Sequence, residues 1–284
     1  MHDGRLKRIV RDLGFSAHRN IYWSWYEPRN FGDWVTPFLF EAITGEIPRW
    51  CARSAQRRVP CIYGAGSLLR HIPVAGKVTV WGSGIISESD EFAAPRQVTA
   101  VRGPRTAHYL RRLGYATSDV FGDPAILLPT FYQSDTAPVS GRCGFIPHYM
   151  DLEFWKDKLP EDVFLIDVTK PVDKVIDDIC SCERTISSSL HGIIVSQAYG
   201  RRSAWMTSVN KLAGDQTKFF DYYEAGNVRD AHPFNVQPGF SLRDVRQMID
   251  DAPQAEVAAL TEDLLKQCPF TPKRNLMSRS DAAS

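Results

Sequence analysis

Several features that would place a protein in a class at once are missing from this sequence of 284 residues. No apolar run approaches the roughly 20 residues that cross a bilayer. The formal net charge is only +1, so no overall field points to nucleic acid or to an anionic membrane surface. The first ten residues are basic, but no apolar core follows them, so they are not a secretory signal. A cytoplasmic location and no nucleic-acid partner are therefore expected.

Metal and dinucleotide fingerprints are also missing. Among the six cysteines only Cys180 and Cys182 form a close pair, and without a second pair nearby there is no zinc pattern. In a cytoplasmic chain these thiols are expected to be reduced and structural. Gly64–Ser67 and Trp81–Gly84 each follow a β-type run, but neither completes the dinucleotide-binding fingerprint. Neither a metal nor a cofactor is predicted.

What the sequence does contain is a regular alternation of β-type runs with helical patterns. Such alternation is typical of parallel sheets. Residues 130–141 change composition and are interpreted as a linker. The sequence therefore predicts an α/β fold with two Rossmann-like parallel α/β domains, residues 1–130 and 142–284, facing a cleft. The predicted strands are Asn20–Tyr26, Val59–Tyr63, Val78–Trp81, Gln97–Val101, Val120–Phe121, Cys143–Pro147, Val163–Asp167, Thr185–Ser187 and Arg202–Met206. A helix is predicted at Val172–Cys180, and the helix that begins after Thr36 is predicted to end at Gly45.

The functional interpretation depends most on the stretch Arg184–Gly200. Its β-type run, Thr185–Ser187, is followed by Ser188 and Ser189 and then by an apolar helical pattern. A helix start offers free N–H groups and a positive dipole end, which favour anions. His191 at this point could donate a proton beside a bound anion. The alternative is structural, with either serine capping the helix and His191 serving as a core histidine.

Charged residues near other strand ends are further candidates. Asp33 follows the first strand, and Thr36 and Pro37 give the next helix its own start signal. That leaves Asp33 either to contact a ligand or to shape the turn. Arg102 falls at a strand end, where ligands bind in open α/β folds. Asp123 precedes a proline and is predicted to cap a helix rather than to act in catalysis.

The strand ends together suit an anionic substrate and proton transfer, although they do not name a reaction. Residues 49–58 are predicted to form a basic loop, which is either a solvated face or a contact for an anionic or lipid-linked substrate. The strand-end set is Asp33, Ser67, Ser83, Arg102, Arg105, His148 and His191.

Six motifs, together with the His191 stretch, resemble the polysaccharide pyruvyl transferase family, nearest to the branch that acts on bacterial exopolysaccharides such as succinoglycan. The resemblance covers residues 20–225. It implies a two-domain arrangement like that of the GT-B glycosyltransferases. It also implies transfer of a pyruvyl group from phosphoenolpyruvate to two sugar hydroxyls, forming a cyclic ketal and releasing phosphate. The motifs are Asn30–Asp33, Gly64–Ser67, Trp81–Gly84, Val101–Thr106, Gly122–Ala125 and Lys218–Tyr223.

The resemblance also implies roles for individual residues. The family's histidine falls on His191, which would protonate the enol carbon, and its arginine falls on Arg102. A carboxylate such as Asp33 would act as base toward the sugar. Many members carry Arg two residues before the histidine, where this chain has Ser189. Either Arg105, Lys211 or Lys218 then takes over the phosphate, or the phosphate rests mainly on the helix N-terminus. Beside catalytic His191, Asp33 and Arg102, the expected substrate contacts are Asn30, Gly32, Gly66, Ser67, Ser83, Arg105, Ser188, Ser189, Lys211 and Lys218.

The expected partners are phosphoenolpyruvate and a sugar or lipid-linked oligosaccharide acceptor. A lipid-linked acceptor would bring the chain into peripheral contact with the inner face of the membrane. The first domain is expected to hold the acceptor and the second the donor, with the acceptor sugar, the ketal linkage and the oligomeric state left open. Two alternatives remain: a GT-B-like glycosyltransferase using a nucleotide sugar, and a non-catalytic protein that binds glycans or anions.

Overall fold

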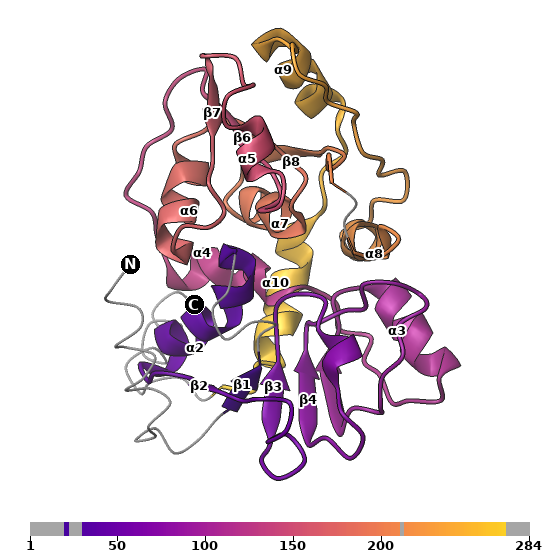
Figure 1. Cartoon of the computed structure of the whole chain (residues 1–284). Coiled ribbons are helices and arrows are strands. Elements are labelled where there is room, and N and C mark those ends of the chain that lie inside the picture. The colour runs from indigo at the N-terminus through magenta and orange to yellow at the C-terminus, as the bar shows by residue number, and fades with distance from the viewer. Residues whose placement is uncertain (1–19, 23–29, 211–212, 271–284) are drawn as a thin grey trace.

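In the computed structural model, which describes residues 20–22, 30–210 and 213–270, the strands form two separate parallel sheets (Figure 1). The first sheet has the order β2-β1-β3-β4-β5, with β1 (Asn20–Tyr22), β2 (Arg49–Trp50), β3 (Cys61–Tyr63), β4 (Val78–Trp81) and β5 (Gln97–Ala100). The second has the order β7-β6-β8-β9, with β6 (Cys143–Ile146), β7 (Val163–Leu165), β8 (Arg184–Ser187) and β9 (Arg202–Trp205). The parallel α/β class is therefore confirmed, whereas the domain limits and the GT-B-like arrangement stay predictions.

Helices connect and cover these strands. The α-helices of the described residues are α2 (Val35–Thr44), α3 (Pro104–Arg112), α4 (Leu128–Phe131), α5 (Leu152–Trp155), α6 (Val172–Cys180), α7 (Leu190–Ala198), α8 (Thr217–Ala225), α9 (Leu242–Asp251) and α10 (Val257–Lys266). Three short 3-10 turns complete the set: η1 (Phe31–Trp34), η2 (Leu69–His71) and η3 (Pro124–Leu127). None of these helices is long and apolar enough to cross a membrane.

One hydrophobic core reaches from the first sheet to the second. The first half is the part of the chain up to the predicted linker, and the second half is the part after it. Ile21 and Phe31 in the first half belong to the same buried cluster as Ile146 and Ile193 in the second. The backbone N–H of Phe31 also donates to the carbonyl of Val168 over 2.7 Å. The two sheets are therefore held together by buried apolar contact as well as by the chain that links them.

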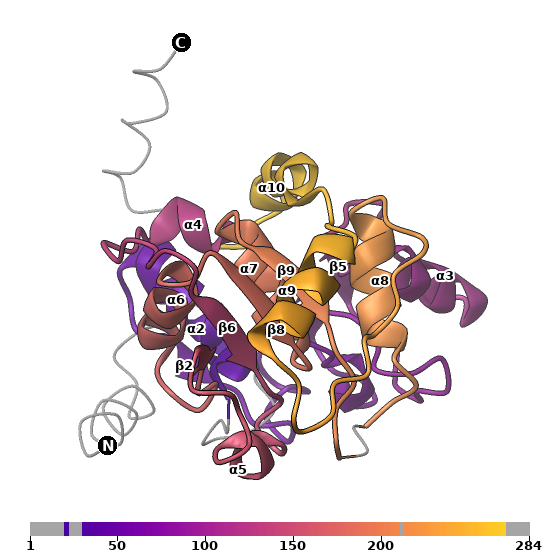
Figure 2. The same ribbon diagram turned by 90° about the horizontal axis from the view of Figure 1, so that it is seen from above.

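Two helices of the second half lie against the first. α10 runs back toward the first sheet, and the indole N–H of Trp81 donates to the carbonyl of Leu264 over 3.0 Å (Figure 1). α8 packs beside α3, and the two helices are neighbours in both views (Figures 1 and 2). α8 carries Lys218, so this packing brings Lys218 near the start of α3.

Several boundaries predicted from the sequence are confirmed, and three local predictions are wrong. β4 and α6 have the expected residues, and Gly45 ends α2 with a left-handed φ of 72°. Thr36 does not cap α2, which begins one residue earlier, because the Thr36 hydroxyl accepts a hydrogen bond from the amide of Ala65. Of the strand expected at 120–121, only Phe121 forms an isolated bridge, to Val101. The run at 49–58 begins with β2 rather than being wholly a loop.

The linker predicted at residues 130–141 begins inside α4 and then continues without helix or strand up to β6. The last four residues of the strand predicted at 20–26 lie outside the described part of the chain.

Candidate active site

The turn between β8 and α7 places His191 in the first turn of a buried helix. The hydroxyl of Ser187 accepts the amide of Ser189 over 3.0 Å and so fixes the turn. Ser189 is the N-cap residue, but its side chain makes no capping hydrogen bond. The hydroxyl of Ser188 accepts the backbone N–H of His148 over 2.8 Å. Neither serine is therefore the side-chain cap that the structural alternative required.

The imidazole of His191 lies among residues of the first half. A Cβ at Gly32 would lie 2.1 Å from Nδ1 of His191, and one at Gly66 would lie 3.7 Å from Cε1. The ring of Phe31 meets the imidazole edge-on, with 6.3 Å between centroids. Only 14% of the His191 side chain is exposed. The histidine of the second half thus fits into a space that glycines of the first half leave open.

Asp123 faces the other side of this imidazole. Its Oδ2 lies 3.6 Å from Nε2 of His191, too far for a hydrogen bond. Nε2 is buried and makes no hydrogen bond to any described residue. Catalytic hydrogen bonds are often long without substrate and tighten when it binds. The arrangement is a histidine with a buried acid as its neighbour, the type of pair that can hold and pass on a proton.

Asp123 does more than the capping predicted for it. Oδ1 accepts the amide of Ala125 and so caps η3, as expected, while Oδ2 accepts the amide of Gly66 over 3.0 Å. Burial raises the pKa of this carboxyl, but His191 and the two amides outweigh burial and hold the pKa below its ordinary 3.8. Asp123 therefore stays ionised beside the imidazole. Sequence reasoning missed this because an Asp before Pro is explained fully by capping.

Asn30 and Asp33 lie on the first-half side of the same histidine. The amide of Asn30 donates to Oδ2 of Asp33 over 2.8 Å, and Oδ1 of Asn30 lies 2.9 Å from where a Gly32 Cβ would stand. Asp33 is partly exposed. The predicted motif therefore does come together with His191, and it contributes a carboxylate within the same wall.

The loop after β3 is held by buried side chains. Gly66 has a φ of 105°, which suits glycine, and the Ser83 hydroxyl donates to the Gly66 carbonyl over 2.8 Å and accepts the amide of Leu68. Ser83 is fully buried, so it shapes this loop rather than facing an open space. The predicted substrate contact of Ser83 remains untested.

Arg102 is fully buried, and its charge is already paired. Nε donates to Asp221 over 3.0 Å, and both side chains have no exposed surface. The two terminal nitrogens donate to Ser67 Oγ and to the carbonyl of Ile85, each over 2.6 Å. Arg102 thus joins the loop that borders His191 to helix α8. The donor contact expected of Arg102 stays a prediction, and a donor could reach it only by replacing one of these partners.

Two further candidates are placed less favourably for anion binding. Arg105 pairs with Glu224 across the α3–α8 contact over 2.7 Å. Lys211 lies outside the described residues.

Lys218 and Ser188 line a cavity of about 380 Å³ at the carboxyl end of β8 and β9. Trp205 and Asn210 line the same cavity. Lys218 is half-buried. Burial, followed by the charges of Arg102 and Arg70, lowers the pKa of Lys218 to about 8. Ser188 precedes His191 by three residues, so the cavity lies at the β8–α7 turn, although His191 is not among its lining residues.

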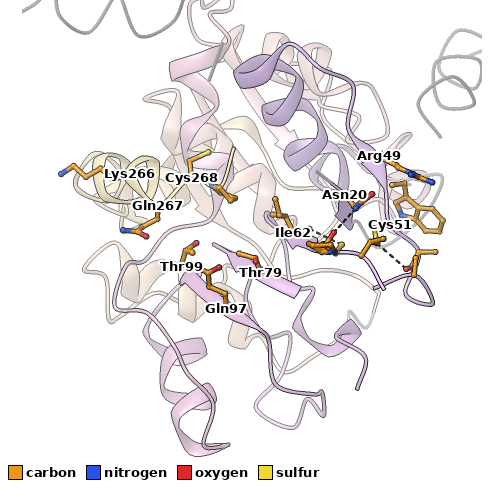
Figure 3. A pocket seen from close by; sticks show the side chains of 17 residues that line it. Asn20, Arg49, Cys51, Ile62, Thr79, Gln97, Thr99, Lys266, Gln267 and Cys268 are labelled. Atoms are coloured by element: carbon orange, nitrogen blue, oxygen red, sulfur yellow. Dashed lines mark hydrogen bonds between the residues drawn. The ribbon is translucent and has the colours of Figure 1, made fainter. Parts of the chain in front are cut away.

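A larger cavity of about 990 Å³ lies elsewhere (Figure 3). It is lined by the starts of the first-sheet strands, among them Asn20 and Cys61, and by Lys266 to Pro269 at the end of α10. The predicted site residues are not among its lining. Carboxyl ends of parallel strands are where α/β folds bind ligands, and this cavity is at the opposite ends. The described residues also contain no group of three His, Cys, Asp or Glu side chains placed to hold a metal.

The fold and site define an α/β protein in which a histidine of the second half meets glycines and a buried aspartate of the first. The chain matches the family described as Polysaccharide pyruvyl transferase over residues 50–208, more than half of its length. The chain therefore belongs to the polysaccharide pyruvyl transferase family. The match includes His191, Asp123 and Arg102, whereas Asn30–Asp33 and Lys218 fall outside it.

Similar proteins extend this comparison. The uncharacterized protein L143 of Acanthamoeba polyphaga mimivirus is 32% identical over 162 residues, which is 54% of this chain and 56% of that protein. The match thus spans about half the length of the curated relative. A solved structure of the functionally uncharacterized protein KP1_0663 from Klebsiella pneumoniae has a TM-score of 0.45 and 16% identity, covering 83% of this chain and 98% of the other.

Proposed function

We propose that the chain transfers a pyruvyl group from phosphoenolpyruvate to two hydroxyls of one sugar in a bacterial exopolysaccharide or its lipid-linked precursor. The observation that carries this is the His191–Asp123 pair, enclosed by Gly32 and Gly66 at the meeting of the two halves. Membership of the pyruvyl transferase family supports the same reaction class. A lipid-linked acceptor would place the reaction in the cytoplasm at the inner face of the membrane.

The reaction needs a proton at carbon and a base at oxygen. The methylene carbon of phosphoenolpyruvate gains a proton, and positive charge develops on the adjacent carbon. One sugar hydroxyl adds there, the bond from that carbon to the phosphate oxygen breaks, and the second hydroxyl adds to close the ketal. Of the two hydroxyl protons, one replaces the proton that the acid gave up and the other leaves with phosphate.

The residues of the site suit these steps. His191 would deliver the proton, with the ionised Asp123 as the buried counter-charge while the imidazole carries it. Asp33, held by Asn30 and partly exposed, would take a proton from a sugar hydroxyl. Gly32 and Gly66 lie close against the imidazole, and a site closed to water would favour the sugar over hydrolysis to free pyruvate.

The test is to incubate the protein with phosphoenolpyruvate and a panel of glycans, measuring phosphate release and analysing the glycan by mass spectrometry. The expected result is one ketal per phosphate released. In D₂O the methyl group of the ketal should gain one deuterium, because the proton comes from an exchangeable acid. Phosphate release with no change in the glycan, or glycosylation from a nucleotide sugar, would contradict the proposal.

A further inference from the structure

The donor carries a phosphate and a carboxylate, yet the arginines expected to hold them are engaged elsewhere. Arg102 has no exposed surface and bonds Asp221, Ser67 and Ile85. Arg105 pairs with Glu224 over 2.7 Å. Breaking either pair for a ligand would leave a carboxylate without its partner, which is costly in the buried case. A cation that binds the donor without this loss must come from another position.

Lys218 occupies such a position. It is the one cation among the described residues that line the 380 Å³ cavity at the carboxyl end of β8 and β9. No carboxylate of the described residues pairs with its ammonium, which lies 5.2 Å from the centre of the Phe219 ring. Ser188 lines the same cavity, but it is almost fully buried and its hydroxyl accepts the backbone N–H of His148. A half-buried, unpaired cation in the wall of a cavity is a site that a phosphate oxygen would satisfy.

We infer that Lys218 binds the phosphate group of the donor in this cavity, and so takes the place of the arginine missing at Ser189. The inference rests on the proposed function for the identity of the donor, but the anion site itself rests on the geometry around Lys218. The donor's phosphate would then lie next to the β8–α7 turn. That placement would bring its enol carbon toward His191, which follows Ser188 by three residues.

The surroundings of Lys218 leave it without a competing acid. Arg102 and Arg70 are the cations that act on Lys218. Burial together with Lys218 lowers the pKa of His148 to about 4, so His148 is neutral near pH 7, and the nearby Asp151 accepts hydrogen bonds from Ser208, Val209 and Asn210. Asp215 also lines the cavity, but its carboxylate accepts from Ser87, Glu88 and Thr217. Asp221, on the same helix, is occupied by Arg102 and Thr106.

The low pKa of Lys218 gives this site a pH dependence. Burial and the nearby arginines lower that pKa to about 8, and a bound anion would raise it again. Affinity for an anion should therefore be full below pH 8 and fall as pH rises above it, by up to about tenfold per pH unit. Sulfate is the suitable probe, because its charge does not change over this range.

The experiment measures sulfate and phosphoenolpyruvate binding by calorimetry from pH 7 to 9.5. Lys218→Met should weaken both at pH 7 by about 10- to 100-fold, the loss of one charge-assisted hydrogen bond. Lys218→Arg should keep the affinity but remove its fall above pH 8. Lys158→Met, at an exposed lysine far along the chain, is the matched control and should bind like the parent.

Three results would overturn the inference: no anion binding by the parent protein, unchanged binding by Lys218→Met, or a fall above pH 8 that persists in Lys218→Arg. Failure of the proposed function looks different. Lys218-dependent anion binding without phosphate release on any glycan would support the anion site and contradict phosphoenolpyruvate as the donor. Ketal formation that is unchanged in Lys218→Met would support the reaction and contradict a role for Lys218 in it.

Discussion

At the scale of single residues, the site depends on a histidine with a buried nitrogen that has no hydrogen-bond partner among the described residues. A core histidine normally satisfies both ring nitrogens, because an unpaired buried polar atom costs stability. His191 instead keeps Nε2 3.6 Å from an ionised carboxylate. Such an arrangement is explained by proton transfer better than by packing.

Replacing His191 should therefore remove activity without unfolding the protein. His191→Gln keeps a hydrogen-bonding side chain but cannot deliver a proton near neutral pH, so turnover should fall about 10²- to 10⁴-fold. The melting temperature should change little. Steady-state phosphate release and thermal denaturation measure the two effects, with the exposed His108→Gln as control. An active His191→Gln enzyme, or a His191→Ala protein that unfolds, would restore the structural alternative.

Asp123→Asn tests the counter-charge. The pKa of Asp123 is lowered in the folded state, so its charge stabilises the fold above pH 3.8 and this contribution is lost as pH falls below that value. Asn removes the titration, so acid should destabilise the variant less steeply than the parent between pH 5 and 3. Turnover at neutral pH should also fall. Denaturation at several pH values across this range measures the free energy of unfolding. If that free energy depends on pH equally in the variant and in the parent, Asp123 is excluded as the charged partner.

At the scale of elements, two backbone segments shape the space for the imidazole. The 3-10 turn η1 supplies Gly32, and the loop after β3 supplies Gly66. Neither glycine contributes a side chain to the chemistry. Their role is to let a ring from α7 enter the wall of the first half.

Gly32→Ala should displace His191. The new Cβ would lie 2.1 Å from Nδ1 of the imidazole, far inside contact distance, so the ring must rotate or move. Turnover should fall while the charges of the site stay unchanged. The informative control is Gly32→Ala in a His191→Ala background, where the clash with the imidazole is absent, the approach to Asn30 Oδ1 remains, and the stability cost of the alanine should shrink. An equal cost in both backgrounds, by urea denaturation, would show that the two residues do not touch.

The helices and strands of this fold were largely predictable from the sequence, whereas the long-range contacts of their side chains were not. The apolar spacing and Gly45 identify α2, and the composition of β4 and α6 gives their bounds. The Thr36 prediction failed because a residue 29 positions away claims its hydroxyl. The pairing of Asp123 with His191 likewise joins two halves that no local pattern connects. Local propensity cannot report such long-range bonds.

At the scale of the whole molecule, the halves are joined by a shared core and by the contact of α3 with α8. Two ion pairs cross that contact. Arg102 and Asp221 are completely buried, whereas the side chains of Arg105 and Glu224 are 33% and 27% exposed. Helix α8 thus supplies the carboxylate of one buried pair and of one partly solvated pair, to Arg102 just before α3 and to Arg105 on α3, which separates the effect of burial from the effect of charge.

Arg102→Met should destabilise the protein far more than Arg105→Met. The first leaves Asp221 buried with only Thr106 to satisfy it, which costs about 3–5 kcal/mol of the free energy of unfolding. The second removes a partly exposed pair worth about 0–1 kcal/mol. Urea denaturation measures the free energy of unfolding of both variants.

Adding Asp221→Leu to Arg102→Met should recover part of the lost stability, because the unpaired carboxylate is removed as well. Equal losses for the two arginines would mean that the buried pair does not hold the halves together. If Arg102→Met instead keeps its stability and loses only affinity for phosphoenolpyruvate, then Arg102 is the donor contact after all and Lys218 is not needed for that role.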